Sequence, residues 1–179
     1  MLDNQRPAPG ETAGPLRLRP ARPGDAAAIA GMLAGLSGRS IYLRYLLPRP
    51  GLPPALAWRE AERLVAGGDG RGAMVALLPG SDGERLVGIG EYAPDGREPG
   101  VAEVALVVAD AWQRRGIGRA LASALVEALG ARGIATLQAV TLLENAGIRR
   151  LFARSPQPYT ARFDGGMLIY RMGLGASMR

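Results

Sequence analysis

The stretch of this sequence with the clearest chemical potential is 102–134, AEVALVVADAWQRRGIGRALASALVEALGARGI. An apolar run that predicts a strand leads into Gly116-Ile117-Gly118, where a long amphipathic helix is predicted to begin. The flanking polar residues are Gln113, Arg114, Arg115 and Arg119. Amides at a helix N-terminus carry the positive end of the helix dipole, glycines let an anion approach them, and arginines add charge-assisted hydrogen bonds. The segment therefore predicts a turn that binds a pyrophosphate.

Context, rather than the glycine spacing, singles out this turn. Glycine makes up 26 of the 179 residues, and G-x-G also begins at Gly68, Gly70, Gly88 and Gly173. Only the triplet at Gly116 follows an apolar strand and opens a helix. A Walker loop is excluded because it needs a lysine, which this chain lacks. A dinucleotide fingerprint is excluded because Leu121 stands where its third glycine belongs.

Three residue types are absent, which limits the catalytic groups that this chain can use. The sequence contains no cysteine, no histidine and no lysine, so all 22 basic residues are arginine. Thiolate and imidazole chemistry, a Schiff base, disulfides and lysine autoacetylation are therefore excluded, and no metal site is predicted. A general base must then be a carboxylate, a tyrosine or a relayed water.

Length and charge set broader limits. A chain of 179 residues with 47% hydrophobic residues suits one domain, expected over 16–174 between tails at 1–15 and 175–179. The first fifteen residues lack the apolar stretch of a secretory signal, and no run is long enough to span a membrane, so a cytoplasmic location is expected. The net charge of +6 fits an anionic partner, but the arginines are dispersed, which argues against nucleic acid. A monomer or a homodimer is expected.

Hydrophobic periodicity predicts a mixed, mostly antiparallel sheet of about seven strands flanked by helices, of the α/β (α+β) class. Asp25 and Ser37 are predicted to cap the helices that follow them. Strands are predicted over 16–22, 73–78, 86–92, 101–108 and 134–141, with a closing hairpin over 159–163 and 167–172. Helices are predicted over 26–36, 37–46, 55–65, 116–131 and 145–153.

The motif Gln113-Arg114-Arg115-Gly116-Ile117-Gly118 resembles the Q/R-x-x-G-x-G/A signature of the GNAT acetyltransferases. The element order over 16–174 is also similar to the order in that superfamily, with the closest match over 102–150. AEVALVVADAWQRRGIGRAL and the earlier SIYLRYL resemble the bacterial protein-lysine acetyltransferases in particular. The resemblance implies the GNAT acyl-CoA N-acyltransferase fold, with acetyl-CoA as the cofactor and an amine as the acceptor.

The resemblance also implies roles for individual residues. A strand with a bulge would place Val107, Val108 and Ala109 where backbone amides meet the pantetheine arm, and the amide of Val107 would stabilise the oxyanion. Asn145 would bind the pantetheine, and Arg149 would reach the nucleotide end. The pyrophosphate would lie against residues 114–120, namely Arg114, Arg115, Gly116, Ile117, Gly118, Arg119 and Ala120.

Two carboxylates compete for the role of base that deprotonates the acceptor amine. Glu103 lies four residues before Val107, and an even separation along a strand places both side chains on one face. A glutamate at this place resembles the base of the lysine-acetylating members. Glu91, on the preceding predicted strand, is the alternative.

The general acid is open as well. Phe152 stands near the place where many family members carry a tyrosine acid, and Tyr159 is a possible substitute. Tyr42, Tyr45 and Trp58 are possible acceptor contacts, although aromatic residues at helical spacing more often belong to a core.

Two functions follow from these patterns. The first is an N-acetyltransferase acting on a protein lysine or a small-molecule amine by direct attack in a ternary complex, since no cysteine is present to form an acyl-enzyme. The alternative is a non-catalytic module that senses acyl-CoA on the same scaffold and needs no base.

Overall fold

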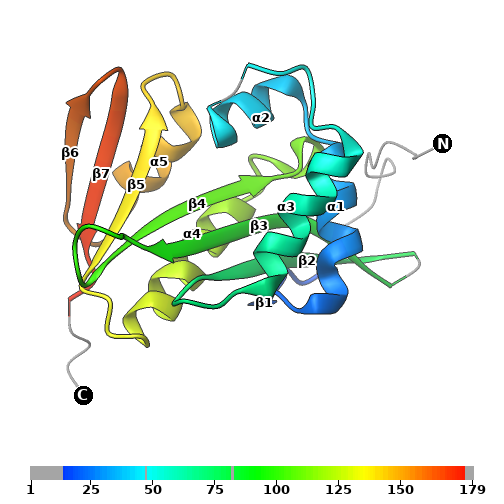
Figure 1. The fold of residues 1–179 in the computed structure, drawn as a ribbon, viewed down its shortest axis with the longest axis horizontal. Coiled ribbons are helices and arrows are strands. Elements are labelled where there is room, and N and C mark those ends of the chain that lie inside the picture. The colour runs from blue at the N-terminus through cyan, green and yellow to red at the C-terminus, as the bar shows by residue number, and fades with distance from the viewer. Residues whose placement is uncertain (1–13, 47, 82, 176–179) are drawn as a thin grey trace.

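A seven-stranded sheet forms the centre of the structure, a computed structural model that describes residues 14–46, 48–81 and 83–175. The strand order is β1-β2-β3-β4-β5-β7-β6, and only β4 and β5 are parallel (Figure 1). The predicted mixed, mostly antiparallel sheet is therefore confirmed. The strands are β1 (Arg17–Pro20), β2 (Gly72–Gly80), β3 (Gly83–Pro94), β4 (Val101–Val108), β5 (Thr136–Leu142), β6 (Tyr159–Asp164) and β7 (Met167–Gly173).

Helices cover both faces of the sheet. α1 and α3 pack on one face, and α4 and α5 lie on the other (Figure 1). The predicted element order is confirmed, although residues 1–13 and 176–179 of the predicted tails lie outside the described residues. The helices are α1 (Ala26–Ala34), α2 (Gly38–Tyr45), α3 (Pro54–Ala66), α4 (Ile117–Gly130) and α5 (Ala146–Ala153), with 3₁₀ turns η1 (Pro23–Asp25) and η2 (Asp110–Trp112).

Among the described residues, no single helix is both long enough and apolar enough to cross a bilayer. The bent pair Pro23–Ala34 and Gly38–Tyr45 satisfies those two criteria only when its helices are counted together.

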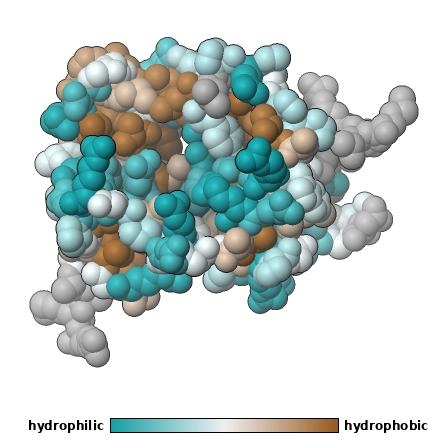
Figure 2. All heavy atoms as spheres, viewed as in Figure 1, coloured by the Kyte–Doolittle hydropathy of each residue, from teal (hydrophilic) through white to brown (hydrophobic). Residues whose placement is uncertain are grey.

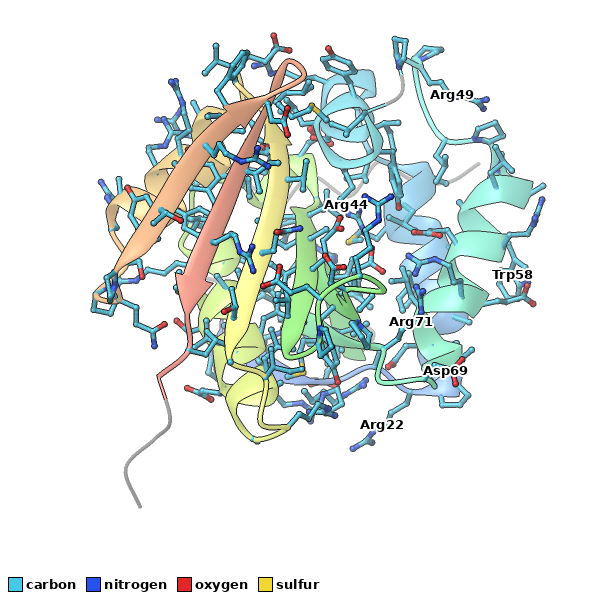
Figure 3. The ribbon with its side chains drawn as sticks, turned by 60° about the vertical axis from the view of Figure 1, so that its left-hand side comes forward. Arg22, Arg44, Arg49, Trp58, Asp69 and Arg71 are labelled. Carbon is cyan, nitrogen blue, oxygen red and sulfur yellow. The ribbon has the colours of Figure 1, made fainter. Side chains whose placement is uncertain are left out.

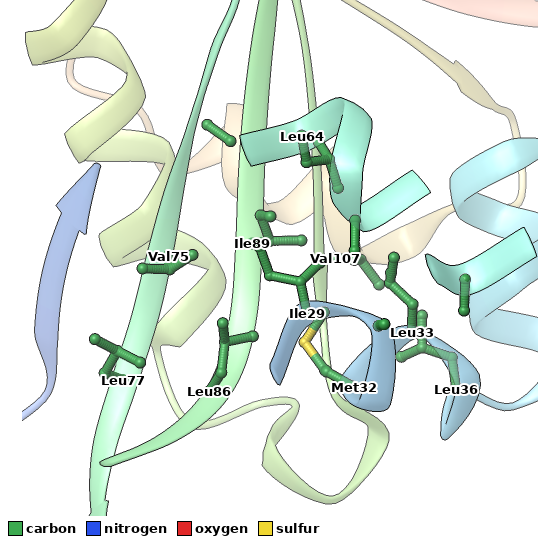
Figure 4. Close-up of a cluster of buried hydrophobic side chains, with 14 of the residues drawn as sticks. Ile29, Met32, Leu33, Leu36, Leu64, Val75, Leu77, Leu86, Ile89 and Val107 are labelled. Atoms are coloured by element: carbon green, nitrogen blue, oxygen red, sulfur yellow. The ribbon is translucent and has the colours of Figure 1, made fainter. Parts of the chain in front are cut away.

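Buried apolar side chains on the two faces hold the layers together. On the α1–α3 face, Ile29 and Leu33 are fully buried against Val75 of β2 and its neighbours (Figure 4). On the other face, Leu125 of α4 lies so close to β3 that a Cβ on Gly90 would approach its Cδ1 to 2.9 Å. Glycine at this position therefore lets α4 pack tightly on the strands that carry the site. Each such buried leucine or isoleucine contributes about 1.5–3 kcal/mol.

The two predicted helix caps have different outcomes. The Ser37 hydroxyl accepts a hydrogen bond from the amide of Ser40, which confirms the predicted cap of α2. The Asp25 prediction is wrong, because its side chain makes no capping bond to α1. Its carboxylate instead accepts two hydrogen bonds from Arg19, at 2.6 and 2.7 Å, and one from the amide of Arg22. The Asp25 carboxylate therefore forms an ion pair with Arg19 of β1 instead of the predicted helix cap.

Candidate active site

The central feature of the site is a gap between the two parallel strands. β4 and β5 pair only at Val101↔Thr136, Ala102↔Leu137 and Glu103↔Gln138. Beyond this junction β4 continues beside β3, and β5 continues beside β7. The far ends of β4 and β5 therefore diverge, and the sheet is open between them (Figure 1).

The bulge expected in β4 is absent. The register between β3 and β4 runs without a shift from Gly88↔Val108 to Pro94↔Ala102. The register shift in this part of the sheet lies instead between Ala76 and Leu77 of β2. The amides of β4 are thus exposed because β5 turns away from β4, and no irregularity of β4 is involved.

Ladder geometry identifies which amides face the gap. The amide of Ala109 donates to the carbonyl of Val87, and the amide of Asp95 donates to that of Val101. Odd-numbered residues of β4 therefore exchange hydrogen bonds with β3, and even-numbered ones point the other way. The prediction that the Val107 amide faces the cofactor is wrong, since Val107 pairs with Ile89. Leu106 and Val108 supply the amides beyond the last β4–β5 pair.

The turn after β4 forms an open helix N-terminus. Gly116 adopts φ 86° and precedes the first residue of α4, and Arg114 also has positive φ, at 63°. Among the residues that the structure describes, no side chain caps α4, and a Cβ on Gly116 would have no neighbour within 4 Å. The first amides of α4 thus face open space, which is the arrangement that a diphosphate requires.

The arginines beside this turn are exposed. Arg114, Arg115 and Arg119 all lie on the surface, where their guanidinium groups can meet an anion. Arg115 also stacks over the ring of buried Trp112, with its Cζ 4.9 Å from the ring centroid. Stacking restricts the Arg115 side chain while leaving its N–H groups available.

Gln113, one of the polar residues predicted to flank a pyrophosphate, uses its side chain for contacts within the chain. Its Nε2 donates to the carbonyl of Val108 and to the hydroxyl of Ser40, each at 3.0 Å. Asp110 accepts from the hydroxyl groups of both Ser37 and Ser40. These side chains tie α2 to the turn, so the side chain of Gln113, although the residue is exposed, supports the turn through contacts within the chain.

The structure places both candidate carboxylates on the α1–α3 face of the sheet. Glu91 pairs with Ala105, two residues from Glu103 on β4, so the two glutamates are diagonal neighbours. Glu103 is exposed beside the gap. Glu91 forms an ion pair with Arg44 of α2, and its other oxygen lies 2.6 Å from Arg63 of α3. A carboxylate held by two guanidinium groups is a poor proton acceptor, so the geometry favours Glu103.

The arginine that holds Glu91 is itself buried. Arg44 extends from α2 toward the strands (Figure 3), and its side chain is only 12% exposed. Burial lowers the pKa of Arg44, while the charges of Glu60 and Glu103 act in the opposite direction. Burial also raises the pKa of the neighbouring Tyr45 to about 12. The Tyr45 phenol therefore stays protonated near neutral pH, so it cannot serve as a general base.

The aromatic residues after β5 form a stack instead of an acid beside the gap. The rings of Phe152 and Tyr170 are stacked, with centroids 4.2 Å apart and planes 9° apart. Tyr159 contacts this pair from β6, the edge strand, so β7 and β5 separate it from the gap. The structure thus does not bring Tyr159 to the place of a general acid. Trp58, 44% exposed on α3, points away from the sheet (Figure 3), and its Nε1 donates to Glu62 on the same helix.

The residues after β5 lie on the far side of the gap. Asn145 is buried, and its side-chain oxygen accepts from the amide of Ile148 at the start of α5. Arg149 is exposed one turn further along the helix. Thr141 of β5 is 3% exposed, and its hydroxyl has no partner among the described residues. An unpaired buried hydroxyl near the gap is consistent with a polar ligand there.

Sequence reasoning missed Arg44 and Asp110. An arginine inside the apolar run SIYLRYL was a signal for a buried charge, since arginine is rarely buried without a partner. Asp110 gave no comparable signal, because its partners lie 70 and 73 residues away.

Comparisons with known proteins agree with this geometry. The model of the Acetyltransferase (GNAT) family matches residues 41–155. The GNAT domain of S. lividans PAT has the same fold at a TM-score of 0.73 and 22% identity, covering 93% of this chain and 99% of that one. A GNAT-family acetyltransferase of Streptococcus pneumoniae gives 0.63 and 22%, covering 89% and 98%. The structure of yncA of Salmonella typhimurium with acetyl-CoA gives 0.64 and 22%, covering 93% and 96%. The chain therefore belongs to the GNAT acetyltransferase family, as an N-acetyltransferase that uses acetyl-CoA.

Proposed function

We propose that this N-acetyltransferase transfers the acetyl group to a primary amine, of a protein lysine or a small molecule, by direct attack in a ternary complex. The observation that carries the proposal is the position of Glu103. It is exposed at the junction of β4 and β5, on the face opposite α4, where the gap with the amides of Leu106 and Val108 begins. A base and two hydrogen-bond donors thus lie around one opening.

Each group has a separate task. Acetyl-CoA supplies an acetyl group activated as a thioester. An alkylammonium has a pKa near 10.4, so Glu103 takes one of its protons, directly or through a water, before the nitrogen can attack. One of the two exposed amides, that of Leu106 or of Val108, would then hydrogen-bond the carbonyl oxygen as it gains negative charge, because the two lie about 6.6 Å apart along the strand and cannot share one oxygen.

The remaining predicted residues hold the donor. The first amides of α4 would bind the diphosphate together with Arg114, Arg115 and Arg119. Asn145 and Arg149, across the gap, would contact the pantetheine and the nucleotide end. Since the side chains of Phe152 and Tyr159 do not supply an acid, we propose that the departing thiolate leaves without a dedicated protein acid, as its low basicity permits.

Steady-state kinetics with a panel of primary amines tests this proposal. Thiol release is followed while acetyl-CoA and the amine are varied together. Intersecting lines in the double-reciprocal plot are expected for a ternary complex. Parallel lines, or acetyl-CoA binding with no amine-dependent thiol release, would count against direct transfer.

A further inference from the structure

The sheet face that carries Glu103 is covered unevenly. α1 and α3 pack over β2, β3 and β4. Within the described part of the chain no helix lies in front of β7 and β6, while α2 lies beside these strands and contacts β5 (Figure 3). This part of the face, next to the candidate active site, is therefore less covered than the part beneath α1 and α3.

Strand register determines which side chains lie on this less covered part of the face. Leu137 and Ala139 of β5 are buried in the cluster that includes Leu125 of α4. Because side chains alternate along a strand, Val140 and Leu142 point to the opposite face. Their partners on β7 are Ile169 and Met167, and all four are only partly buried. We call these four residues the β5–β7 patch, and Figure 2 shows hydrophobic side chains gathered over this part of the molecule.

The patch is continuous with the position of the base. Gln138, the β5 partner of Glu103, lies two residues before Val140 and four before Leu142. At about 3.3 Å per residue, the patch begins roughly 7 Å from Gln138 and extends to roughly 13 Å. An acceptor that lies along β5 with its amine at Glu103 would therefore place its neighbouring groups on this patch.

We propose that the β5–β7 patch binds the acceptor, and that the acceptor is a lysine in a protein segment with apolar side chains on both sides of it. This inference rests on the proposed function and specifies its substrate. Glu103 complements the ammonium charge, while the patch offers apolar contact for the flanking residues. An open strand face suits an extended segment, because small molecules are held in concave pockets that bury most of their surface.

The charged side chains around the β5–β7 patch favour neither an acidic nor a basic acceptor segment. Arg162 of β6 pairs with Asp164 at 3.1 Å, and Arg171 of β7 pairs with Glu98 at 2.6 Å. Both arginines at the rim are thus neutralised within the chain. Selection of the segment then depends on apolar contact.

Two peptides test the inference. They have equal length and charge, and their single lysine is flanked by valine and leucine in one and by serine and glycine in the other. We expect the apolar peptide to have a kcat/KM about tenfold higher, the usual scale for a few buried methyl groups. Equal kcat/KM values would overturn the proposal.

Variants locate the contact. Val140→Thr with Ile169→Thr keeps β-branched residues in both strands, so the sheet should be retained. The preference for the apolar peptide should fall to about twofold or less, while acetyl-CoA affinity is unchanged. Phe163→Thr is the matched control, because Phe163 pairs with Leu168 and so lies on the other face of the same hairpin. The proposal is wrong if the double variant keeps the preference or if the control loses it.

Binding measurements separate this inference from the proposed function. Fluorescence anisotropy of each labelled peptide is measured in the presence of CoA, alongside sedimentation of the protein alone. In one outcome, the apolar peptide binds, the double variant binds it more weakly, and neither peptide is acetylated. This outcome would support the patch as a binding site and refute acetyl transfer to these peptides. Acetylation of small amines and of both peptides alike would retain transfer and refute the patch. A dimer that the double variant dissociates would show that a second copy of the chain occupies the patch, and would also refute it.

Discussion

Asp110 and Ser37, 73 residues apart in the chain, are joined by two hydrogen bonds, at 2.8 Å from the amide of Ser37 and at 2.6 Å from its hydroxyl. Ser37 caps α2, beside the proposed acceptor surface, and Asp110 opens the turn that leads to α4. The link thus fixes the position of α2 relative to the diphosphate turn. Partial burial raises the pKa of Asp110, but the hydrogen bonds from Ser37 and Ser40 outweigh this effect and hold it below the ordinary value.

Asp110→Asn should destabilise the fold by about 1–2 kcal/mol, the scale for charged hydrogen bonds at a partly exposed site. A lowered folded-state pKa means that the carboxylate stabilises the fold above its unfolded-state pKa, near 4, and loses this effect as the pH falls through the folded-state value. The difference from wild type in urea unfolding should therefore be constant from about pH 7 to 5 and shrink below about pH 4. Asp164→Asn, at an exposed ion pair, should differ little from wild type. A constant difference down to pH 2 would contradict this account.

Glu103→Gln should lower kcat by roughly 10²–10⁴-fold at neutral pH, because the glutamine side chain cannot take a proton from the ammonium group of the substrate. Acetyl-CoA affinity, measured by calorimetry, should not change. Glu91→Gln removes a carboxylate that forms ion pairs with Arg44 and Arg63. It should therefore reduce thermal stability and leave kcat within a few fold of the wild-type value. The reverse pattern in the two variants would identify Glu91 as the base.

Arg115→Ala should weaken acetyl-CoA binding by about tenfold, since the lost guanidinium contributes a charge-assisted hydrogen bond of about 1.5 kcal/mol. Its affinity should also depend less on salt than that of wild type. Arg59→Ala, an exposed arginine on α3, changes the net charge equally and should leave the dissociation constant unchanged. If both variants bind equally weakly, the effect comes from overall charge and not from the turn.

Hydrogen exchange followed by NMR should distinguish neighbouring amides of β4. The Leu106 and Val108 amides face the gap, so they should exchange rapidly in the free protein and slow by at least about tenfold with acetyl-CoA. The Val107 amide lies in the β3 ladder and should be protected in both states. Slow exchange of Leu106 in the free protein would show that another group already occupies its amide.

The sequence predicted the elements well and several of the contacts between them poorly. Val101–Val108 and the cap at Ser37 follow from local patterns, and the structure has both. The parity of the β4 amides depends on pairing with β3, so the choice of Val107 over Leu106 could not be made locally. The two arginines around Glu91 come from α2 and α3, at sequence distances that no spacing rule covers. Contacts with residues distant in the sequence determine which β4 amide and which glutamate remain free to meet a ligand.

The short junction between β4 and β5 divides the sheet into a four-strand part and a three-strand part joined by three residue pairs. On the α4 side, Leu125 and Leu129 pack with Leu137 and Met172 and pin the two parts together. On the opposite side, α2 contacts both β4 and β5 beside the same junction. Helices therefore bridge the junction on both faces of the sheet, so the three residue pairs do not have to hold the edges of the gap in place alone.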